Sequence, residues 1–312
     1  MPSLALQAVD VLGEVNLLNP PKVTRVVLSL CQNHTTLGEV NAGGSGEAPN
    51  WAVGQHPEAR LRLMSQSPMA WWKRNRASPE TRATDMPLIR LEGVSKMFSS
   101  GAEEPAVALR DVTADIGRGE YVSVSGPSGC GKSTFLSILA LLDTPTAGRY
   151  SLAGRDVEDF SPRDRARTRN IEIGLVFQSF NLIGDLTVYE NVEYPLTLRG
   201  ITPGEREART IAALERVGVA NRKAQRPGSI SGGHQQLVAI ARAIAGRQPI
   251  VLADEPTGNL DSASGDAVMQ MIAELHQSGS TICLATHNPK YIAMATRHIY
   301  LFDGRIVDQP SN

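Results

Sequence analysis

The sequence predicts an α/β fold in which a mainly parallel sheet is covered by helices. Short apolar runs, each typical of a buried strand, alternate with longer segments that have helical apolar spacing. The run Ile250 to Ala253 contains no polar residue, as expected of a strand that is buried on both faces. A glycine-rich loop also stands between one strand and a helix. Alternation of this kind is typical of parallel strands joined by helical crossovers.

Five short runs are predicted to be strands, because they are rich in apolar and β-branched residues and are bounded by polar or turn-forming residues. They are Leu88 to Ser95, Glu120 to Ser125, Ile171 to Phe177, Ile250 to Ala253 and Thr281 to Ala285. Three segments have apolar residues at helical spacing and are predicted to be helices. They are Lys132 to Leu142, Pro203 to Val217 and Gln235 to Ala245.

Composition and charge restrict the function further. The 312 residues include 41% apolar and 20% charged residues, which is ordinary for a folded soluble domain. The formal net charge is -1, so the charge gives no reason to expect a nucleic-acid partner. No stretch has the ~20 apolar residues that a membrane-spanning helix needs, so a membrane role is expected to come through a partner chain. The three cysteines fit no disulfide or metal-binding spacing.

The chain changes character near Asp85. Residues 1–85 hold a Gly-, Ser- and Pro-rich stretch at 41–50 and a locally basic segment at 60–82, with little periodicity. We therefore expect a poorly ordered N-terminal extension followed by one folded domain. The basic segment is interpreted as a solvated extension, with a lipid- or partner-contacting arm as the alternative. A further hypothesis is that the native chain starts at Met86, and mass spectrometry of the native N-terminus would test it.

The run Gly126-Pro-Ser-Gly-Cys-Gly-Lys132-Ser133-Thr134 matches the phosphate-binding loop G-x-x-x-x-G-K-[ST] in full. Its glycines let the backbone turn several N–H groups toward phosphate oxygens, and the dipole of the following helix favours the same anion. Lys132 is expected to reach the β- and γ-phosphates and Ser133 to bind Mg²⁺. The fold class is therefore a P-loop NTPase. The predicted nucleotide contacts of this loop are Gly126, Ser128, Gly129, Cys130, Gly131, Lys132, Ser133 and Thr134.

Two acids, Asp254 and Glu255, follow the apolar run that begins at Ile250. The carboxyl edge of a parallel sheet is where ligands bind in such folds, so both carboxylates are expected to lie there. Asp254 is predicted to hold Mg²⁺, directly or through water. Glu255 is predicted to be the general base that polarises the attacking water.

The run Ser231-Gly232-Gly233-His234-Gln235-Gln236-Leu237 opens a predicted helix ahead of the Asp-Glu strand. A helix N-terminus offers backbone N–H groups and a dipole end to an anion. This run resembles the signature sequence of ABC ATPases, and residues 88–308 resemble the nucleotide-binding subunit of an ABC transporter. Residues 179–182, 186–192 and 253–261 resemble the branch that includes macrolide exporters and lipoprotein-releasing systems.

The resemblance implies further features of fold and site. Residues 86–312 are expected to form an ABC-type ATP-binding domain, with an antiparallel β subdomain and a helical subdomain that carries the signature. By position, Gln178 resembles the glutamine that senses Mg²⁺ and the γ-phosphate, and His287 resembles the histidine that contacts the γ-phosphate. Asp261 resembles the acid that links two sites across a dimer. Phe98 resembles the aromatic residue that stacks on adenine, where tyrosine is usual and phenylalanine keeps the π face.

Two positions depart from the family's signature. His234 stands where glutamine is usual, and Leu237 stands where arginine is usual. Leucine cannot replace the hydrogen bonds of a guanidinium group, so the full catalytic rate is in question while nucleotide binding is not. The resulting hypothesis is that His234→Gln combined with Leu237→Arg raises ATP turnover in the purified dimer. An unchanged rate would refute it.

The resemblance implies an ATPase that uses ATP and Mg²⁺ and works as a homodimer, each signature completing the partner's site. It further implies an integral membrane permease as a second partner, a peripheral location at the cytoplasmic face of the membrane, and no nucleic-acid partner. Export of a drug, peptide or lipoprotein is the expected task, with signalling through a membrane partner as the alternative. Soluble ABC ATPases of translation or DNA repair usually carry two cassettes or long coiled-coil insertions, which this chain lacks.

Overall fold

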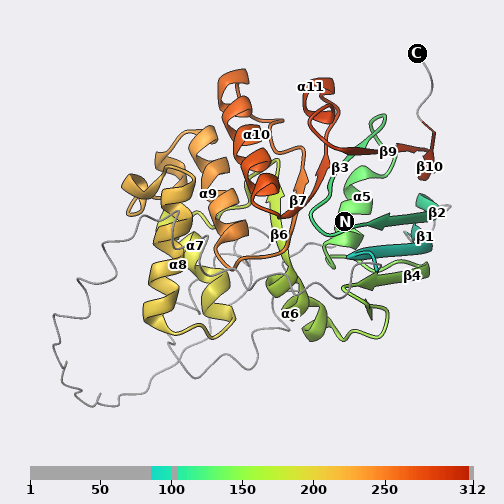
Figure 1. Ribbon diagram of the computed structural model, residues 1–312, viewed down its shortest axis with the longest axis horizontal. Helices are drawn as coiled ribbons and strands as arrows, with labels where there is room; N and C mark the ends of the chain where they lie inside the picture. Colours follow the sequence, from blue (N-terminus) through green and yellow to red (C-terminus); the bar gives the residue numbers. More distant parts are fainter. Residues whose placement is uncertain (1–85, 100–104, 309–312) are drawn as a thin grey trace, which may run out of the picture. The chain divides into compact units, whose positions relative to one another are not determined.

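The computed structural model describes residues 86–99 and 105–308, so the predicted N-terminal extension over 1–85 lies outside the described residues. The described part is an α/β structure with strands and helices in alternation, as predicted (Figure 1). Its strands are β1 (Ile89–Phe98), β2 (Ala106–Ile116), β3 (Tyr121–Ser125), β4 (Ala147–Leu152), β5 (Arg155–Asp156), β6 (Ile173–Phe177), β7 (Ile250–Asp254), β8 (Thr281–Ala285), β9 (Arg297–Phe302) and β10 (Arg305–Val307). Its α-helices are α5 (Lys132–Leu139), α6 (Pro162–Glu172), α7 (Val188–Leu198), α8 (Pro203–Arg216), α9 (Gly232–Ile244), α10 (Ser262–Gln277) and α11 (Pro289–Ile292).

The larger sheet of the described residues has six strands in the order β10-β9-β3-β8-β7-β6. Its strand pairs β9–β3, β3–β8, β8–β7 and β7–β6 are parallel, and only β10 pairs antiparallel, with β9. Parallel neighbours end at the same edge of the sheet. The residues that follow β3, β8, β7 and β6 are therefore brought to one edge, although they lie far apart in the sequence.

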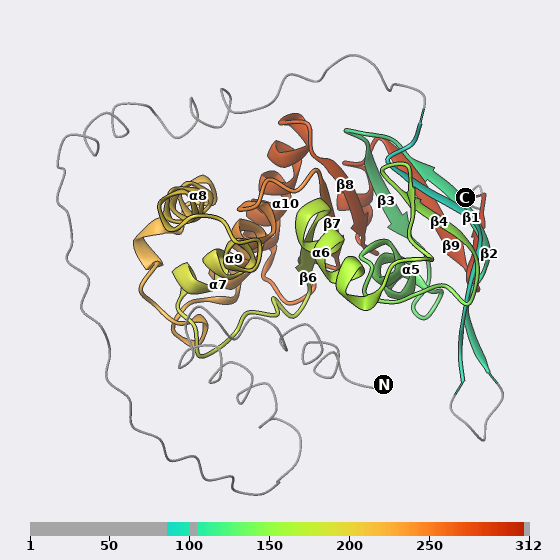
Figure 2. The same cartoon turned by 90° about the horizontal axis from the view of Figure 1, so that it is seen from below.

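The larger sheet is buried on both faces. On β7, Ile250 and Leu252 pack in the cluster that contains the apolar side chains of α5. The alternate residues Val251 and Ala253 pack in the second cluster, with α9 and α10. Figure 2 shows α5 and α10 on opposite sides of these strands. Two-sided burial explains why the run has no polar residue, because side chains alternate between the faces of a strand.

A second sheet is antiparallel and has four strands in the order β2-β1-β4-β5. Ile89 of β1 lies opposite Ile116 on one neighbour and opposite Leu152 on the other. All three side chains are at most 1% exposed, so they form part of the core. This sheet confirms the antiparallel β subdomain that the family resemblance implies.

The helices α7, α8 and α9 lie side by side, away from the antiparallel sheet (Figure 1). Helix α7 begins with a capping box in which Thr187 and Glu190 satisfy each other's backbone N–H groups. Helix α9 lies close against β6, where a Cβ on Gly174 would collide with the backbone of Ala243. The signature run is thus carried by a helical layer that is attached to the parallel sheet, as expected.

Several element boundaries differ from the sequence prediction, among them those of β1, which runs from Ile89 to Phe98 rather than from Leu88 to Ser95. Ile171 belongs to the last turn of α6, which is capped by Ser161, and the strand begins two residues later at Ile173. Helix α5 ends at Leu139 rather than at Leu142, because Leu141 adopts a left-handed φ of 56° that an α-helix does not permit. Helix α9 begins at Gly232 rather than at Gln235, since Ser231 caps it.

Candidate active site

Four neighbouring strands supply the candidate site at their carboxyl ends. The phosphate loop follows β3, and the pair Asp254 and Glu255 lies at the end of β7. Between these strands runs β8, which is followed by Thr286 and His287. Gln178 directly follows β6, the last strand of the sheet. The structure therefore collects the lysine, the acids, the histidine and the glutamine along one sheet edge, where α/β folds bind ligands.

The phosphate loop requires glycine at two of its turns. Gly126 has a φ of 143°, and a Cβ there would collide with the Leu301 carbonyl group. Gly131 has a φ of 107°, and a Cβ would lie 2.5 Å from the Ala108 oxygen. Side chains rarely adopt such φ values, and neither site has room for one. The loop backbone is thus fixed between β3 and α5, and Ser128 and Gly129 at its tip are exposed.

Lys132 folds back over the loop that it terminates. Its Nζ donates to the carbonyl oxygens of Gly126 at 2.8 Å and Pro127 at 2.9 Å. The buried Cys130 thiol lies beneath it, with Sγ 3.9 Å from the same Nζ. An ammonium group held at this place can exchange its carbonyl partners for phosphate oxygens without leaving the loop.

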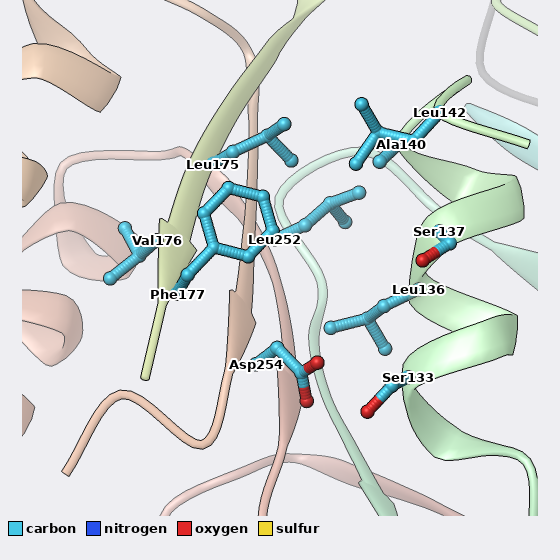
Figure 3. Close-up of a pocket in the computed structure, with 10 residues that line it drawn as sticks. All are labelled: Ser133, Leu136, Ser137, Ala140, Leu142, Leu175, Val176, Phe177, Leu252 and Asp254. Atoms are coloured by element: carbon cyan, nitrogen blue, oxygen red, sulfur yellow. The ribbon is translucent and has the colours of Figure 1, made fainter. Parts of the chain in front are cut away.

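Asp254 and Ser133 form the candidate Mg²⁺ pair. The Ser133 hydroxyl hydrogen bonds to the Asp254 carboxylate, and Figure 3 shows the two groups turned toward one another. Burial is the largest influence and raises the pKa of Asp254, while the hydrogen bond from Ser133 lowers it. A small pocket of about 20 Å³ lies beside the pair, room for about one water molecule. Its other walls are mostly apolar and come from α5 and the residues just after it, β6 and β7 (Figure 3).

Glu255 and His287 are in direct contact. The His287 Nδ1 lies 2.7 Å from Glu255 Oε1, and the Thr286 hydroxyl donates to the other carboxylate oxygen at 3.4 Å. Glu255 has a left-handed φ of 45°, and its N–H donates to the Ala285 carbonyl oxygen at 2.9 Å. A φ of this kind in a residue other than glycine costs about 1–2 kcal/mol. The turn points the carboxylate at the residues that follow β8.

Gln178 is held by Asn259 through two hydrogen bonds. Its side-chain amide donates to Asn259 Oδ1 at 3.2 Å, and the Asn259 amide donates back to the Gln178 carbonyl oxygen at 3.1 Å. Gly258 lies so close that a Cβ would be 2.6 Å from the glutamine Nε2. The loop after β7 therefore sets the position of the residue after β6.

The signature residues cap α9 and lie outside the strand-end cluster. Ser231 is exposed and is the N-cap of α9, accepting a long hydrogen bond of 3.4 Å from the His234 N–H. Its Oγ also lies 2.6 Å from His234 Nδ1. Among residues 86–99 and 105–308, the partners that the structure gives to Ser231 lie within its own helix, and none belongs to the phosphate loop. Gly232 and Gly233 form the first turn and face residues that follow β7.

Two further predicted residues are placed apart from the cluster. Phe98 ends β1 with 46% of its surface exposed, and Lys96 Nζ lies 5.0 Å from the centre of its ring. One face of the ring therefore meets a cation, a favourable contact for an aromatic quadrupole. Asp261 is the N-cap of α10, where it accepts from the Ser264 N–H at 3.0 Å. The hydrogen bond from the Ser264 hydroxyl is the largest influence and lowers the pKa of Asp261, and the backbone N–H of Ser264 adds to it.

Sequence reasoning missed two residues of α9 that hold the segment after β6. Arg242 donates to the carbonyl oxygens of Asn181 at 2.5 Å and Phe180 at 3.0 Å, both in residues with left-handed φ. The fully buried Gln236 donates to the Phe177 carbonyl oxygen at 3.3 Å. A polar side chain on the buried face of an otherwise apolar helix was the available signal. Leu237, by contrast, packs against the apolar cluster of the helical layer.

In the part of the chain that the structure describes, no helix combines the length and the apolar character that crossing a membrane requires.

Comparison with known proteins identifies the family. The ABC transporter family matches residues 109–258. The uncharacterized ABC transporter ATP-binding protein YknY of Bacillus subtilis is 43% identical over 224 residues, which are 72% of this chain and 97% of that protein. The macrolide export ATP-binding/permease protein MacB of Bradyrhizobium diazoefficiens is 45% identical over 221 residues, 71% of this chain. The chain spans about a third of the length of the MacB relatives that it matches.

Solved structures agree with this assignment. A dimeric post-hydrolysis state of the ATP-binding cassette MJ0796, bound to ADP and Pi, is 40% identical with a TM-score of 0.66. The match covers 70% of this chain and 96% of that one. A second dimeric structure of the same bacterial cassette is 41% identical, also with a TM-score of 0.66. The chain belongs to the ABC transporter family and is an ATP-binding cassette, the ATPase of such a system.

Proposed function

We propose that this cassette powers an export system of the macrolide-exporter branch through a separate integral membrane subunit. It acts as a homodimer at the cytoplasmic face of the membrane and extrudes a drug, peptide or lipoprotein. The observation that carries the proposal is the strand-end cluster, in which Lys132, Asp254, Glu255 and His287 lie along one sheet edge. The MacB relatives, named as export proteins with ATP-binding and permease functions, support the direction and the kind of partner.

In a homodimer, each chain supplies its signature serine to the nucleotide site of the other chain. The signature serine caps α9, and its hydrogen-bond partners in the described residues lie in its own helix rather than in the phosphate loop, so a second chain is the source we expect for the serine of each site. A second copy in antiparallel orientation provides the missing serine for each site. The dimeric MJ0796 structures support this arrangement, since they show that a cassette of this sequence class forms dimers.

The residues present fit Mg²⁺. Ser133 and Asp254 offer oxygen ligands, the kind that Mg²⁺ prefers, and Mg²⁺ in nucleotide sites usually combines one or two protein oxygens with phosphates and water. Burial raises the pKa of Asp254, so a cation beside this carboxylate would relieve the cost of its charge. When bound, Mg²⁺ would neutralise developing charge on the phosphates.

The remaining chemistry belongs to the protein's own groups. Lys132 is held where it can grip phosphate oxygens, and the glycine-rich backbone offers N–H groups. Glu255 accepts a proton from the attacking water, while His287 holds this carboxylate at 2.7 Å and faces the γ-phosphate. Gln178, fixed by Asn259, completes the site and begins the segment that carries nucleotide state to the membrane subunit.

The test uses the full chain with the substitution Glu255→Gln, which retains the size of the side chain and removes the base. Saturating ATP and Mg²⁺ should convert this variant to a species of twice the monomer mass in multi-angle light scattering. Its ATPase rate should fall by about 10²–10⁴-fold, the contribution typical of a general base. Adding Lys132→Ala should abolish the dimer by removing the phosphate grip. A strictly monomeric Glu255→Gln protein without nucleotide affinity would refute the proposal.

The membrane partner requires its own experiment. The tagged wild-type chain, purified from a gentle detergent extract of its native cells, should bring down an integral membrane protein that mass spectrometry can identify. A chain carrying substitutions of the exposed residues Ser179 and Asp185, in the segment after Gln178, should lose that protein while keeping ATP-dependent dimerisation. Recovery of no membrane protein would contradict the transport proposal and leave the ATPase assignment intact.

A further inference from the structure

The signature of this chain contains an imidazole within hydrogen-bond distance of the signature serine. His234 Nδ1 lies 2.6 Å from Ser231 Oγ, and the His234 backbone N–H also points at that oxygen from 3.4 Å. Ser231 is exposed and His234 is half-buried, so the pair lies on the accessible tip of α9. The glutamine that is usual at this position has no ring nitrogen, and it cannot gain or lose a proton near neutral pH.

The protonation state of the His234 imidazole determines whether the Ser231 hydroxyl can donate a hydrogen bond to a phosphate. A neutral ring with its proton on Nε2 presents a lone pair at Nδ1, so the Ser231 hydroxyl donates its only proton to the ring. The serine then turns lone pairs toward an incoming phosphate oxygen. A protonated ring donates from Nδ1 instead, and the serine proton becomes available to the phosphate. The positive ring also adds a charge that favours an anion.

We propose that His234 is a positioning residue that makes the grip of Ser231 on the partner subunit's bound ATP depend on proton concentration, tight in acid and weaker above neutral pH. This inference rests on the proposed function, since it needs the signature of one chain to meet the nucleotide of another. Each His234 takes up one proton, and its serine hydroxyl is then available to donate a hydrogen bond to the phosphate. The cassette dimer is thereby coupled to the pH of its compartment.

The groups around the first turn of α9 do not titrate in the same range. On the side of α10, Gly233 faces Ser264, whose hydrogen bonds lower the pKa of the capping acid Asp261. Phe180 and the Asn259 carbonyl group face Gly232. The nearest cation of the same helix that the structure describes is Arg242, whose pKa burial lowers only to about 10. In the described residues His234 has no ion pair, and the contact that the structure gives its ring is the one with Ser231.

The experiment measures the dimer dissociation constant of the Glu255→Gln protein with saturating ATP and Mg²⁺ at pH 6.0, 7.0 and 8.0, by sedimentation equilibrium. We expect dimerisation to weaken by about tenfold or more from pH 6 to pH 8, the size of one charge-assisted hydrogen bond per site. Adding His234→Gln should flatten this dependence, because an amide donates to the serine at every pH. Other titrating groups, including ATP and His287, contribute equally to both proteins and cancel in the comparison.

A matched control comes from the second serine–histidine pair. His298 Nδ1 lies 2.7 Å from Ser123 Oγ, on β9 and β3 rather than on α9. Glu255→Gln with His298→Gln should keep the full pH dependence. Equal slopes with histidine or glutamine at position 234 would overturn the inference, as would a flattened slope in the His298→Gln control. Absence of any dimer at every pH would instead remove the proposed function, and this inference with it.

A second experiment locates the proton on the His234 ring directly. If the Ser231 hydroxyl donates to Nδ1, nitrogen-15 NMR of the labelled chain without nucleotide should show His234 at pH 8 as the tautomer with its proton on Nε2. The same resonance should move to the doubly protonated position on acidification. A neutral His234 with its proton on Nδ1 would overturn the inference, since the serine would then keep its own proton at both pH values.

Discussion

At the scale of single residues, the site contains two features that lower the stability of the folded chain. Asp254 is buried enough that its pKa is raised, and Glu255 beside it occupies a left-handed backbone conformation. Both features lower stability and both serve a phosphate with its metal, so the folded chain without ligand carries a cost at this place. Function and stability should therefore respond in opposite directions to changes at these positions.

The first prediction follows for Asp254→Asn. Because burial raises the pKa of this acid, the folded protein binds its proton more tightly than the unfolded chain does. Its contribution to stability is therefore lost as pH rises from the ordinary aspartate range through the raised value. At pH 7 the asparagine variant should melt roughly 2–4 °C higher than the wild type without ligand, the shift that about 1 kcal/mol causes in a domain of this size.

The same variant should lose most of the additional stabilisation that Mg²⁺ and ATP give the wild type. Scanning calorimetry with and without ligand measures both effects. Asp308→Asn, an exposed acid after β10, is the matched control and should change neither melting temperature. A variant that melts lower than the wild type without ligand would contradict the prediction.

A second prediction concerns Arg242. Its side chain joins α9 to both left-handed residues after Gln178, through two carbonyl oxygens. Lysine keeps the charge but cannot reach both oxygens with a planar fork. Arg242→Lys should cost about 1–3 kcal/mol of unfolding free energy in urea titrations, as expected for partly buried charge-assisted hydrogen bonds that are left unmade. Arg118→Lys, at an exposed turn, should be neutral, and equal losses in the two variants would argue against the clamp.

The roles of some site residues could be predicted from the sequence, whereas the contacts of others could not. Lys132, Asp254 and Glu255 could be predicted because their chemistry depends on side-chain type and on position after an apolar strand. The carbonyl partners of Lys132 and Arg242 could not, because any residue supplies a backbone carbonyl and leaves no pattern. The reciprocal bonds between Gln178 and Asn259 were equally hidden, since they join two loops from neighbouring strands.

At the scale of elements, the attachment of α9 to β6 decides where the signature lies. Gly174 is the point of closest approach, since a Cβ there would meet the backbone of Ala243. The apolar strand pattern predicted β6, but it also included Ile171, which belongs to α6. Apolar and β-branched content does not separate the last turn of a helix from the start of a strand.

The third prediction tests this contact. Gly174→Ala should push α9 away from β6 and lower the unfolding free energy by about 1–3 kcal/mol, the usual cost of overpacking. Gly204→Ala, in the first turn of α8 with open space around it, is the matched control and should be neutral or stabilise by up to about 1 kcal/mol. Urea titrations measure both. A stable Gly174→Ala protein would show that the two elements can separate without cost.

At the scale of the whole described molecule, helix–strand alternation predicted the parallel sheet but not its strand order. The order β3-β8-β7-β6 places strands that are distant in sequence next to one another, so it is a tertiary property. That order determines that His287 stands beside Glu255 and that the phosphate loop lies on the other side of His287. The family resemblance, not the periodicity, supplied the antiparallel and helical subdomains. The extension over residues 1–85 remains a prediction.

The fourth prediction belongs to this scale. If ATP joins two chains, the melting temperature of the Glu255→Gln protein with ATP and Mg²⁺ should rise with protein concentration, because association stabilises by mass action. Without nucleotide the melting temperature should not depend on concentration. Differential scanning fluorimetry over a hundredfold range of protein concentration measures the difference. The same protein with Lys132→Ala is the control, and it should show no concentration dependence in either condition.

The bonds of Lys132 to the start of its own loop have a consequence for turnover. Because the ammonium group already donates to two carbonyl oxygens, it does not have to be ordered when nucleotide binds. Binding becomes an exchange of one set of oxygens for another, and departure of the product lets the original pair re-form. The loop thus supplies oxygen partners to its own lysine, which keep the ammonium group ordered at the end of β3.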